Sequence, residues 1–195
     1  MPSAFITGAR GFLGGHITRQ LLDAGWEVTA LLRPGSNGTA LSALVDAVFH
    51  VAGNTSLWRH QNRRQYQDNV MGTRALITAA LRNQAGRFIH TSSISAWGIQ
   101  EEAIDEASPS NAAGDWIGYN RTKYLAEEEI RHGMQHGLDA VILNPCGIIG
   151  AGDTHNWSQM ITLIEQRKLP GVPPGGGNFC AVAEVARAHL TAVEK

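Results

Sequence analysis

Cysteine, lysine and unbalanced charge are scarce in this sequence, and each shortage excludes a class of protein. The 195 residues carry 16 Lys and Arg against 17 Asp and Glu, a near-neutral balance that argues against a dedicated nucleic-acid or membrane-surface binder. Only 17% of the residues are charged whereas 43% are apolar, which excludes a disordered chain and predicts a sizeable core. No run approaches the ~18 uncharged apolar residues that a membrane span needs.

The two cysteines, Cys146 and Cys180, stand far apart in a sequence that shows no secretory signal pattern. We therefore expect free thiols, a reducing compartment and a cytoplasmic location. The length predicts a single domain over residues 1–195. No metal site is expected, because His132 and His136, which share a face of a predicted helix, have no third ligand.

Short apolar strands alternate with helices along the chain. The pattern predicts strands at residues 4–7, 27–32, 47–51, 87–91 and 139–143, and helices around Ile17 and at 69–82, 119–136 and 182–193. This alternation is typical of a parallel sheet covered on both faces, so we expect an α/β, doubly wound Rossmann domain. Right-handed crossovers should place the strand around Phe5 between those around Val28 and Val48.

Two longer connections, residues 94–118 and 145–178, interrupt this regular alternation. Ligands of such sheets bind beyond the carboxyl ends of the strands, where long connections usually carry function. We therefore predict that both segments are loops on the substrate side.

A glycine-rich loop follows the first predicted strand and precedes the first helix. Residues 7–14 read T-G-x-x-G-x-x-G, in which glycines allow a tight turn and a close approach to a pyrophosphate at the helix start. The alternative is a glycine-rich turn without a ligand. If the loop holds a dinucleotide, the contacts are Gly8, Arg10, Gly11, Phe12, Leu13 and Gly14.

Arg33 stands at the end of the second predicted strand. A site selective for NAD would carry Asp or Glu there to accept hydrogen bonds from the ribose hydroxyls, whereas a guanidinium can pair with the additional phosphate of NADP. Arg33 therefore favours NADP, with NAD as the alternative cofactor. The competing interpretation of Arg33 is a solvated arginine before a turn.

Tyr119 and Lys123 are four residues apart on a predicted helix, so both project from one face. A nearby positive charge favours a phenolate and lowers the tyrosine pKa toward a value useful for acid–base catalysis. The same spacing is common where a core tyrosine precedes a solvated lysine. Here, however, the sequence has three lysines in all, and the cluster Thr91-Ser92-Ser93 ends a strand of the same predicted sheet.

The combined motifs resemble the extended branch of the short-chain dehydrogenase/reductase superfamily, the NAD-dependent epimerase/dehydratase family. Besides the glycine loop and the segment from Tyr119 to Lys123, the motifs that carry the resemblance are His50-Val51-Ala52-Gly53, residues 68–73 (DNVMGT), residues 91–98 (TSSISAWG) and Asn144-Pro145-Cys146-Gly147. Arg33 and the run Tyr-Asn-Arg-Thr-Lys-Tyr-Leu-Ala-Glu from Tyr119 are most similar to the dihydroflavonol reductase group.

The resemblance implies a role for each motif. Tyr119 would exchange a proton with the substrate oxygen, Lys123 would hold the nicotinamide ribose and lower the tyrosine pKa, and Ser93 would hydrogen-bond the carbonyl, with Ser92 as the fallback. Asn69 would support the active-site helix or cap its own helix. The remaining cofactor contacts would be Val51, Ala52, Gly53, Thr91, Ser92, Tyr119, Lys123, Pro145, Cys146 and Gly147.

The resemblance also has gaps. Family members have a third strand between the positions of Arg33 and Ala47 and continue well past that of Lys195, so we expect one strand and most of the C-terminal substrate region to be missing. The function implied is an NADP-dependent reductase of a small-molecule carbonyl, such as an aldehyde, a ketone or a dihydroflavonol; a homodimer is compatible with it. The alternatives are a nucleotide-sugar epimerase or dehydratase with bound NAD, and a non-catalytic dinucleotide-binding regulator.

Replacing Arg33 with Asp should reverse a preference for NADPH over NADH. Loss of one charge-assisted phosphate contact costs roughly 1.5–3 kcal/mol, which corresponds to about one to two decades in affinity. Titrations of the parent and of Arg33→Asp with both cofactors measure the effect. Equal affinities of the parent for NADPH and NADH would contradict the assignment.

Overall fold

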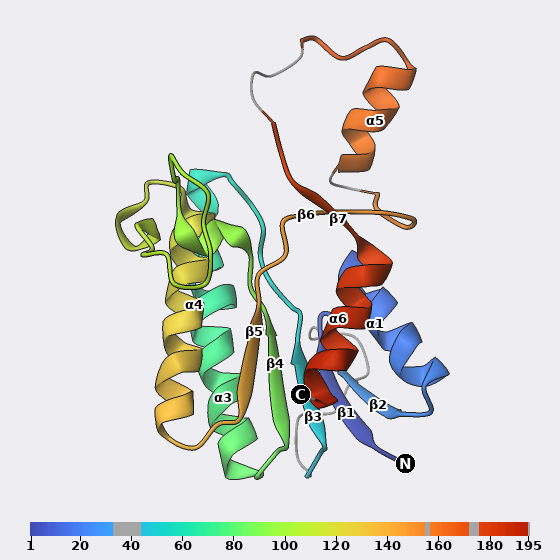
Figure 1. Cartoon of the computed structure of the whole chain (residues 1–195), viewed down its shortest axis with the longest axis vertical. Helices are drawn as coiled ribbons and strands as arrows, with labels where there is room; N and C mark the ends of the chain where they lie inside the picture. The colour runs from blue at the N-terminus through green and yellow to red at the C-terminus, as the bar shows by residue number, and fades with distance from the viewer. Residues whose placement is uncertain (33–43, 155–156, 172–175, 195) are drawn as a thin grey trace.

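The computed structural model describes residues 1–32, 44–154, 157–171 and 176–194. At its centre lies a parallel sheet of five described strands, β1 (Ser3–Thr7), β2 (Glu27–Leu31), β3 (Ala47–His50), β4 (Arg87–Thr91) and β5 (Ala140–Leu143) (Figure 1). The strand order is β2-β1-β3-β4-β5. The predicted α/β, Rossmann-like fold is therefore confirmed.

Strand β1 is the point at which the chain reverses its direction across the sheet. Phe5 pairs with Thr29 of β2 on one side and with Val48 of β3 on the other, which confirms the predicted neighbours. The glycine loop begins directly after β1 and therefore lies at the carboxyl end of the sheet, where parallel folds bind ligands. We expected one strand to be missing between Arg33 and Ala47. Residues 33–43 of that segment lie outside the described residues.

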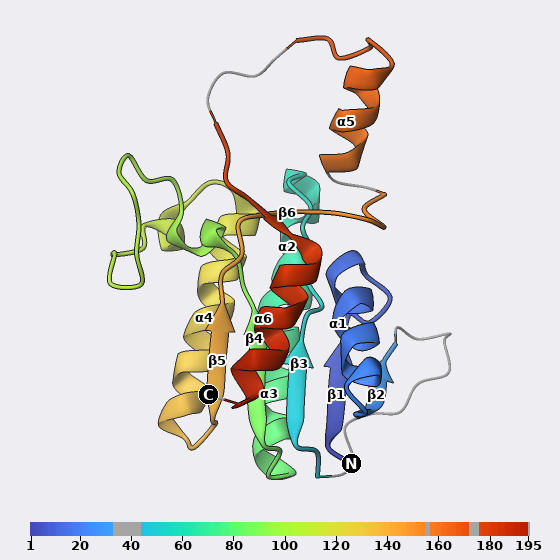
Figure 2. The ribbon, with the colours of Figure 1, turned by 45° about the vertical axis from the view of Figure 1, so that its right-hand side comes forward.

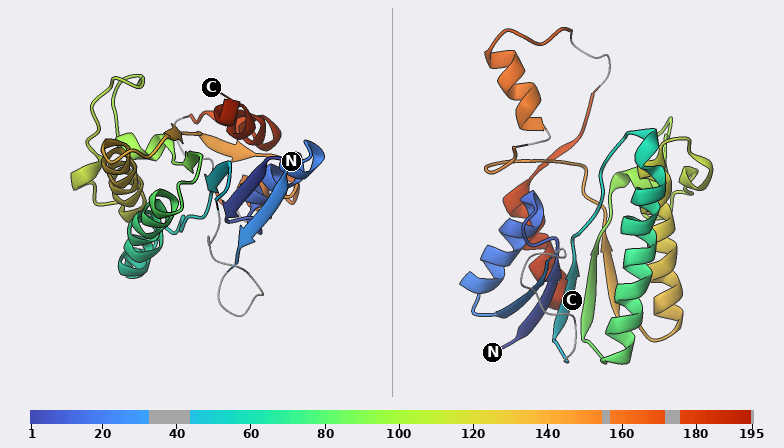
Figure 3. Two further views of the ribbon diagram at one scale, coloured as in Figure 1. Left: turned by 90° about the horizontal axis from the view of Figure 1, so that it is seen from below. Right: turned by 180° about the vertical axis from the view of Figure 1, so that it is seen from behind.

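Helices cover both faces of the sheet. Helices α1 (Phe12–Asp23) and α6 (Val182–Glu194) pack together on one face, and α3 (Gly72–Arg82) and α4 (Gly118–Gln135) pack on the other (Figures 1 and 3). The left view of Figure 3 shows the sheet edge-on between these two helix pairs. None of the helices described here is long and apolar enough to cross a membrane.

The core consists of two apolar layers, one on each side of the sheet. Successive side chains of a strand point to opposite faces, so Ile6, Phe49 and Ile89 join the layer under α1 and α6. Their strand neighbours Phe5, Val48 and Phe88 join the layer under α3 and α4. Because both faces are buried, these strands are continuously apolar rather than alternating.

The helix predicted at residues 69–82 is the last part of a longer helical run, which ends with α3. It is preceded by a 3₁₀ turn (Arg59–Gln61), by α2 (Asn62–Tyr66) and by a π-helical turn (Gln67–Met71) that runs directly into α3. Asn69 lies within that π-helical turn and uses its side chain to bond the backbone of Asn54. Widened turns of this kind are frequent at functional sites, and periodicity at 3.6 residues does not indicate them.

The prediction of a plain loop over residues 145–178 is wrong. The segment contains β6 (Gly147–Ile149) and α5 (Trp157–Glu165), and β6 pairs in parallel with β7 (Phe179–Ala181) beyond the carboxyl ends of the main strands (Figure 2). Strands this short depend on a partner distant in sequence, so local patterning does not reveal them. Residues 94–118 are irregular as predicted, apart from 3₁₀ turns at Ile94–Trp97 and Ala112–Gly114.

Neighbouring histidines are buried where the central strands end. His50 of β3 and His90 of β4 pair in register, and their ring centroids are 5.1 Å apart. Burial lowers the pKa of His50 to about 3 and the pKa of His90 well below its ordinary value. His50 bonds Thr7 and Thr73, whereas neither ring nitrogen of His90 has a partner among the described residues. The fold therefore holds both rings neutral.

This burial makes the fold sensitive to acid. The unfolded chain protonates its histidines near pH 6.5 while the buried rings stay neutral, so their contribution to stability is full above that pH and is lost as the pH falls toward 3. As the pH falls from 7 to 5, each such histidine should lower the free energy of unfolding by about 2 kcal/mol. Urea unfolding of the parent, of His50→Gln and of the exposed-site control His60→Gln measures this loss.

We expect His50→Gln to be less stable at pH 7 but to lose less stability than the parent on acidification. The control His60→Gln should follow the parent, because the His60 side chain is exposed. Identical pH dependence in the parent and His50→Gln would contradict the assignment of a neutral, buried His50.

Candidate active site

The glycine loop forms a cradle that added side chains would fill. Gly8 has a φ of +76°, which disfavours other residues, and a Cβ placed on it would lie 2.7 Å from the backbone nitrogen of Ala52. A Cβ on Gly14 would overlap the carbonyl oxygen of Gly8. The loop can therefore press backbone against backbone and leave its concave side open to a ligand.

The start of α1 is suited to an anion. Gly11 caps the helix without a side-chain hydrogen bond, and the first turn contains no acidic residue. Free backbone N–H groups and the helix dipole favour negative charge there, and the side chain of Arg10 is exposed beside the loop. The loop thus fits the pyrophosphate of a dinucleotide. Arg33, on which the NADP prediction depends, lies outside the described residues.

Lys123 is buried below the carboxyl ends of β3 and β4. Its side chain is only 6% exposed, and Nζ donates a hydrogen bond of 2.9 Å to the carbonyl oxygen of Thr91. A Cβ on Gly53 would lie 3.5 Å from Nζ, so the predicted segment from Val51 to Gly53 reaches the lysine. Burial lowers the pKa of Lys123 to about 8, which leaves the ammonium charged at neutral pH.

Tyr119 lies one helical turn before Lys123 on α4, and the Lys123 Nζ is 6.0 Å from the centroid of the Tyr119 ring. The prediction that Lys123 lowers the tyrosine pKa is wrong for this structure. Burial raises the pKa of Tyr119, and the nearby side chain of Ser93 opposes that rise. Tyr119 is therefore protonated at neutral pH, as a proton donor must be.

The two candidate serines differ in their partners. The Ser92 hydroxyl donates a hydrogen bond of 2.5 Å to the buried carboxylate of Glu127. The Ser93 hydroxyl accepts from the backbone nitrogen of Ser95 and is close enough to Tyr119 to act on its pKa. Ser93 also stands next to Pro145, whose carbonyl oxygen accepts from the nitrogen of Ile94 at 3.2 Å. Of the two serines, Ser93 faces the tyrosine.

Asn69 does not cap a helix, because it lies inside the continuous helical run described above. Its side chain accepts from the nitrogen of Asn54 and donates 3.1 Å to the hydroxyl of Thr122, which in turn donates to the carbonyl of Tyr119. The buried His50 extends the same network. One ring nitrogen bonds Thr7 beside the glycine loop, and the other bonds Thr73, which donates to the Asn69 carbonyl.

The segment Pro145-Cys146-Gly147 follows β5 and leads into β6. Its Cys146 thiol neighbours that of Cys180 on β7, and both cysteines are free. Burial first, and the neighbouring Cys146 second, raise the pKa of Cys180 to about 11. The pairing of β6 with β7 therefore brings Cys146 and Cys180 together, although they are far apart in the sequence. Local sequence patterning does not indicate this pairing.

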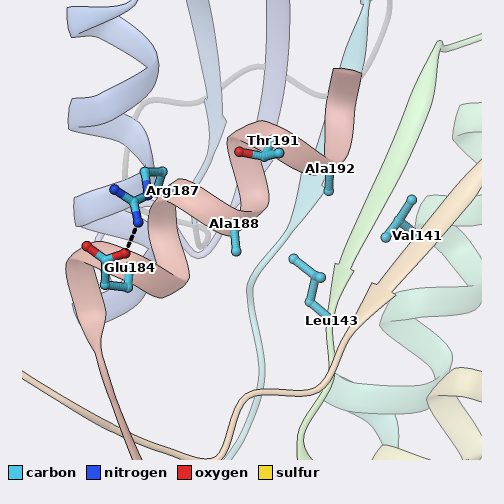
Figure 4. Close-up of a pocket in the computed structure, with 7 residues that line it drawn as sticks. All are labelled: Val141, Leu143, Glu184, Arg187, Ala188, Thr191 and Ala192. Atoms are coloured by element: carbon cyan, nitrogen blue, oxygen red, sulfur yellow. Dashed lines mark hydrogen bonds and ion pairs between the residues drawn. The ribbon is translucent and has the colours of Figure 1, made fainter. Parts of the chain in front are cut away.

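A shallow groove of about 460 Å³ lies elsewhere, between β5 and α6 on the other face of the sheet from α4 (Figure 4). Its charged groups, Glu184 and Arg187, pair with each other, and the rest of its lining is Val141, Leu143, Ala188, Thr191 and Ala192. The groove therefore offers no unpaired acid or base. Nor do the described residues contain a cluster of three or more His, Cys, Asp or Glu arranged to hold a metal.

The model of the NAD dependent epimerase/dehydratase family matches residues 4–195. The chain belongs to this family. Its curated relatives include a putative dihydroflavonol 4-reductase of Synechocystis, 31% identical over 98% of this chain, and sterol demethylase protein B of Methylococcus capsulatus, 28% identical over 99%. The chain spans 63% and 66% of the lengths of these relatives, respectively.

Solved structures of other proteins share the fold. The crystal structure of gox2253 matches the whole chain with a TM-score of 0.89 and 29% identity, and this chain covers 67% of it. The Bordetella bronchiseptica enzyme WbmH in complex with NAD⁺ matches with a TM-score of 0.85 at 21% identity, over 72% of its length. At that lower identity the likeness establishes the fold alone.

Replacing Gly14 with Ala should weaken dinucleotide binding by about tenfold or more, because the added methyl group overlaps the Gly8 carbonyl and must displace the loop. The adjacent Gly15 provides a matched control, since a Cβ there meets only the Ala9 carbonyl oxygen at an ordinary 3.6 Å. Fluorescence titration with NADPH and NADH, with thermal unfolding alongside, separates lost binding from lost stability. Equal affinities of the Gly14→Ala and Gly15→Ala variants would contradict the assignment of the glycine loop as the dinucleotide site.

Proposed function

We propose that this chain is the cofactor-binding and catalytic part of an NADP-dependent reductase that acts on the carbonyl of a small, largely apolar molecule. The observation that carries the proposal is the meeting of Ser93, Tyr119 and Lys123 at the carboxyl ends of β3 and β4. The phenol is protonated and the ammonium charged at neutral pH, and the serine side chain lies close enough to the phenol to act on its pKa.

A bound reduced nicotinamide supplies a hydride to the carbonyl carbon of the substrate. Tyr119 donates the balancing proton from its hydroxyl to the carbonyl oxygen, which becomes the alcohol oxygen. Ser93 donates a hydrogen bond to the same oxygen and stabilises the negative charge that develops on it. The Lys123 ammonium, which is charged at neutral pH, would hold the nicotinamide ribose of a bound cofactor.

This chain would contact the cofactor at its pyrophosphate and at its nicotinamide end. The glycine cradle and the start of α1 receive the pyrophosphate, and Arg10 stands beside it as a cation. Ala52 and Gly53 are both exposed, and a Cβ on Gly53 would lie 3.5 Å from the Lys123 Nζ. The Pro145 carbonyl accepts from the nitrogen of Ile94, the residue after Ser93. The choice of NADP rests on Arg33 and on the absence of an acid at the end of β2.

Exposed apolar side chains support an apolar substrate. Trp116 is 72% exposed three residues before Tyr119, and Ile94 is 38% exposed directly after Ser93. Leu57 and Trp58, in the connection that follows β3, are 74% and 64% exposed. Exposed apolar side chains close in sequence to the polar site residues favour an apolar ligand. Relatives of the chain also include several with reductase or hydroxysteroid dehydrogenase names.

An epimerase or dehydratase with bound NAD is the second candidate, favoured by the family model and by solved neighbours with NAD. Such an enzyme would use the same tyrosine and lysine. A screen of aldehydes, ketones and dihydroflavonols with NADPH and NADH distinguishes the candidates. Net oxidation of NADPH supports the reductase, and turnover of a nucleotide sugar with no net change in added cofactor supports the epimerase.

Replacing Tyr119 with Phe should remove nearly all turnover and leave cofactor affinity close to that of the parent, because the lost hydroxyl acts mainly in the transition state. Ser93→Ala should cost less, about 10²–10³ in rate. Lys123→Ala should impair both turnover and cofactor binding. Steady-state kinetics with NADPH and direct cofactor titration measure both quantities.

Tyr124→Phe is the matched control for this series, since Tyr124 lies on the same helix and outside the proposed site. Ser92→Ala tests the fallback serine. Parental activity in Tyr119→Phe would overturn the role of Tyr119 as proton donor. Absence of turnover in the parent, with cofactor still bound, would instead favour the non-catalytic dinucleotide-binding regulator.

A further inference from the structure

Glu127 is a buried carboxylate that the proposed chemistry does not use. Only 3% of the residue is exposed, yet three donors surround its two oxygens. Oε1 accepts from the Ser92 hydroxyl at 2.5 Å and from the Asn144 amide at 2.6 Å, and Oε2 accepts from Arg131 at 2.8 Å. These three donors offset the cost of burying the carboxyl group away from water.

These bonds join three elements that deliver the candidate site. Glu127 belongs to α4, which carries Tyr119 and Lys123, while Ser92 follows β4 and Asn144 follows β5. The Asn144 amide also donates 3.1 Å to the carbonyl oxygen of Ser93. The Glu127 carboxylate therefore connects α4 to Ser92, the residue before Ser93. Through Asn144 it also connects α4 to the Ser93 carbonyl and to the residue before Pro145.

Glu127 also provides negative charge close to Lys123. The two residues are four apart on α4 and project from the same face of the helix. The Lys123 ammonium donates its hydrogen bond to a neutral carbonyl. The other titratable groups that face it are Tyr119 on α4, His50 on β3 and His90 on β4, all neutral at pH 7. Arg131, half exposed, lies beyond the carboxylate.

We propose that Glu127 is a positioning residue of the candidate site, whose carboxylate keeps Lys123 in its ammonium form and fixes Ser93 opposite Tyr119. The proposal deepens the proposed function and rests on it for the catalytic roles of Ser93, Tyr119 and Lys123. Its electrostatic part is independent of any substrate, because the charge on Lys123 is a property of the chain alone.

The test is an NMR titration of lysine side chains in protein labelled with ¹³C-lysine. The sequence has three lysines, so Lys123 can be assigned by comparison with a Lys123→Met variant. In Glu127→Gln, which preserves the size of the side chain and removes its charge, we expect the pKa of Lys123 to fall by about one unit or more below that of the parent. The kcat for carbonyl reduction should fall with it, while the substrate KM changes little.

Glu128→Gln is the matched control, because Glu128 is the next residue of the same helix, is exposed and also pairs with Arg131. It should leave the pKa of Lys123 at the parental value. Arg131→Gln removes an exposed cation beside Glu127 and should move the Lys123 pKa upward, so it tests the proposal even if Glu127→Gln fails to fold.

The proposal is overturned if the Lys123 pKa is unchanged in Glu127→Gln, or if Glu128→Gln shifts it as much. When Glu127→Gln does not fold, an unchanged pKa in Arg131→Gln overturns it instead. Failure of the proposed function is seen separately, as absence of NADPH turnover in the parent, and it leaves the NMR result intact.

Discussion

A single buried hydrogen bond, from the Lys123 ammonium to the Thr91 carbonyl, sets the arrangement of this molecule's candidate site. Desolvation makes a buried ammonium expensive, so the structure around it must supply acceptors and negative charge. The strand end provides the carbonyl, and the next turn of α4 provides Glu127. The same burial keeps Tyr119 protonated and leaves Ser93 as its side-chain partner. These are the states that a reductive site requires before the reaction starts.

The cofactor cradle and the catalytic helix are also mechanically connected. Neutral His50 stands between Thr7 at the end of β1 and Thr73 on α3, and the network continues through Asn69 to the turn that carries Tyr119. Fully bonded buried networks rigidify the elements that they join. Buried hydrogen bonds therefore connect the end of β1, where the glycine loop begins, with the start of α4, in addition to the contacts that the parallel sheet itself provides.

Sequence patterning predicted the five strands of the main sheet, the order β2-β1-β3 and the glycine loop, because strongly apolar strands and glycine spacing are local signals. It placed Lys123 and Tyr119 on one helix face, since helical spacing is also local. Burial is not local, so the sequence misjudged the direction of the Tyr119 pKa. Glu127 could have been noticed as an acid four residues after Lys123, whereas its bonds to Ser92 and Asn144, the π-helical turn at Asn69 and the meeting of Cys146 with Cys180 depend on tertiary packing.

A crystal structure of the chain with NADP⁺ tests the central claim most directly. The account predicts that the pyrophosphate lies on the backbone between Gly11 and Leu13, and that the Lys123 Nζ donates to the nicotinamide ribose while Tyr119 and Ser93 face the open side of the nicotinamide ring. A dinucleotide bound away from the glycine loop, or a nicotinamide ribose out of reach of Lys123, would contradict it.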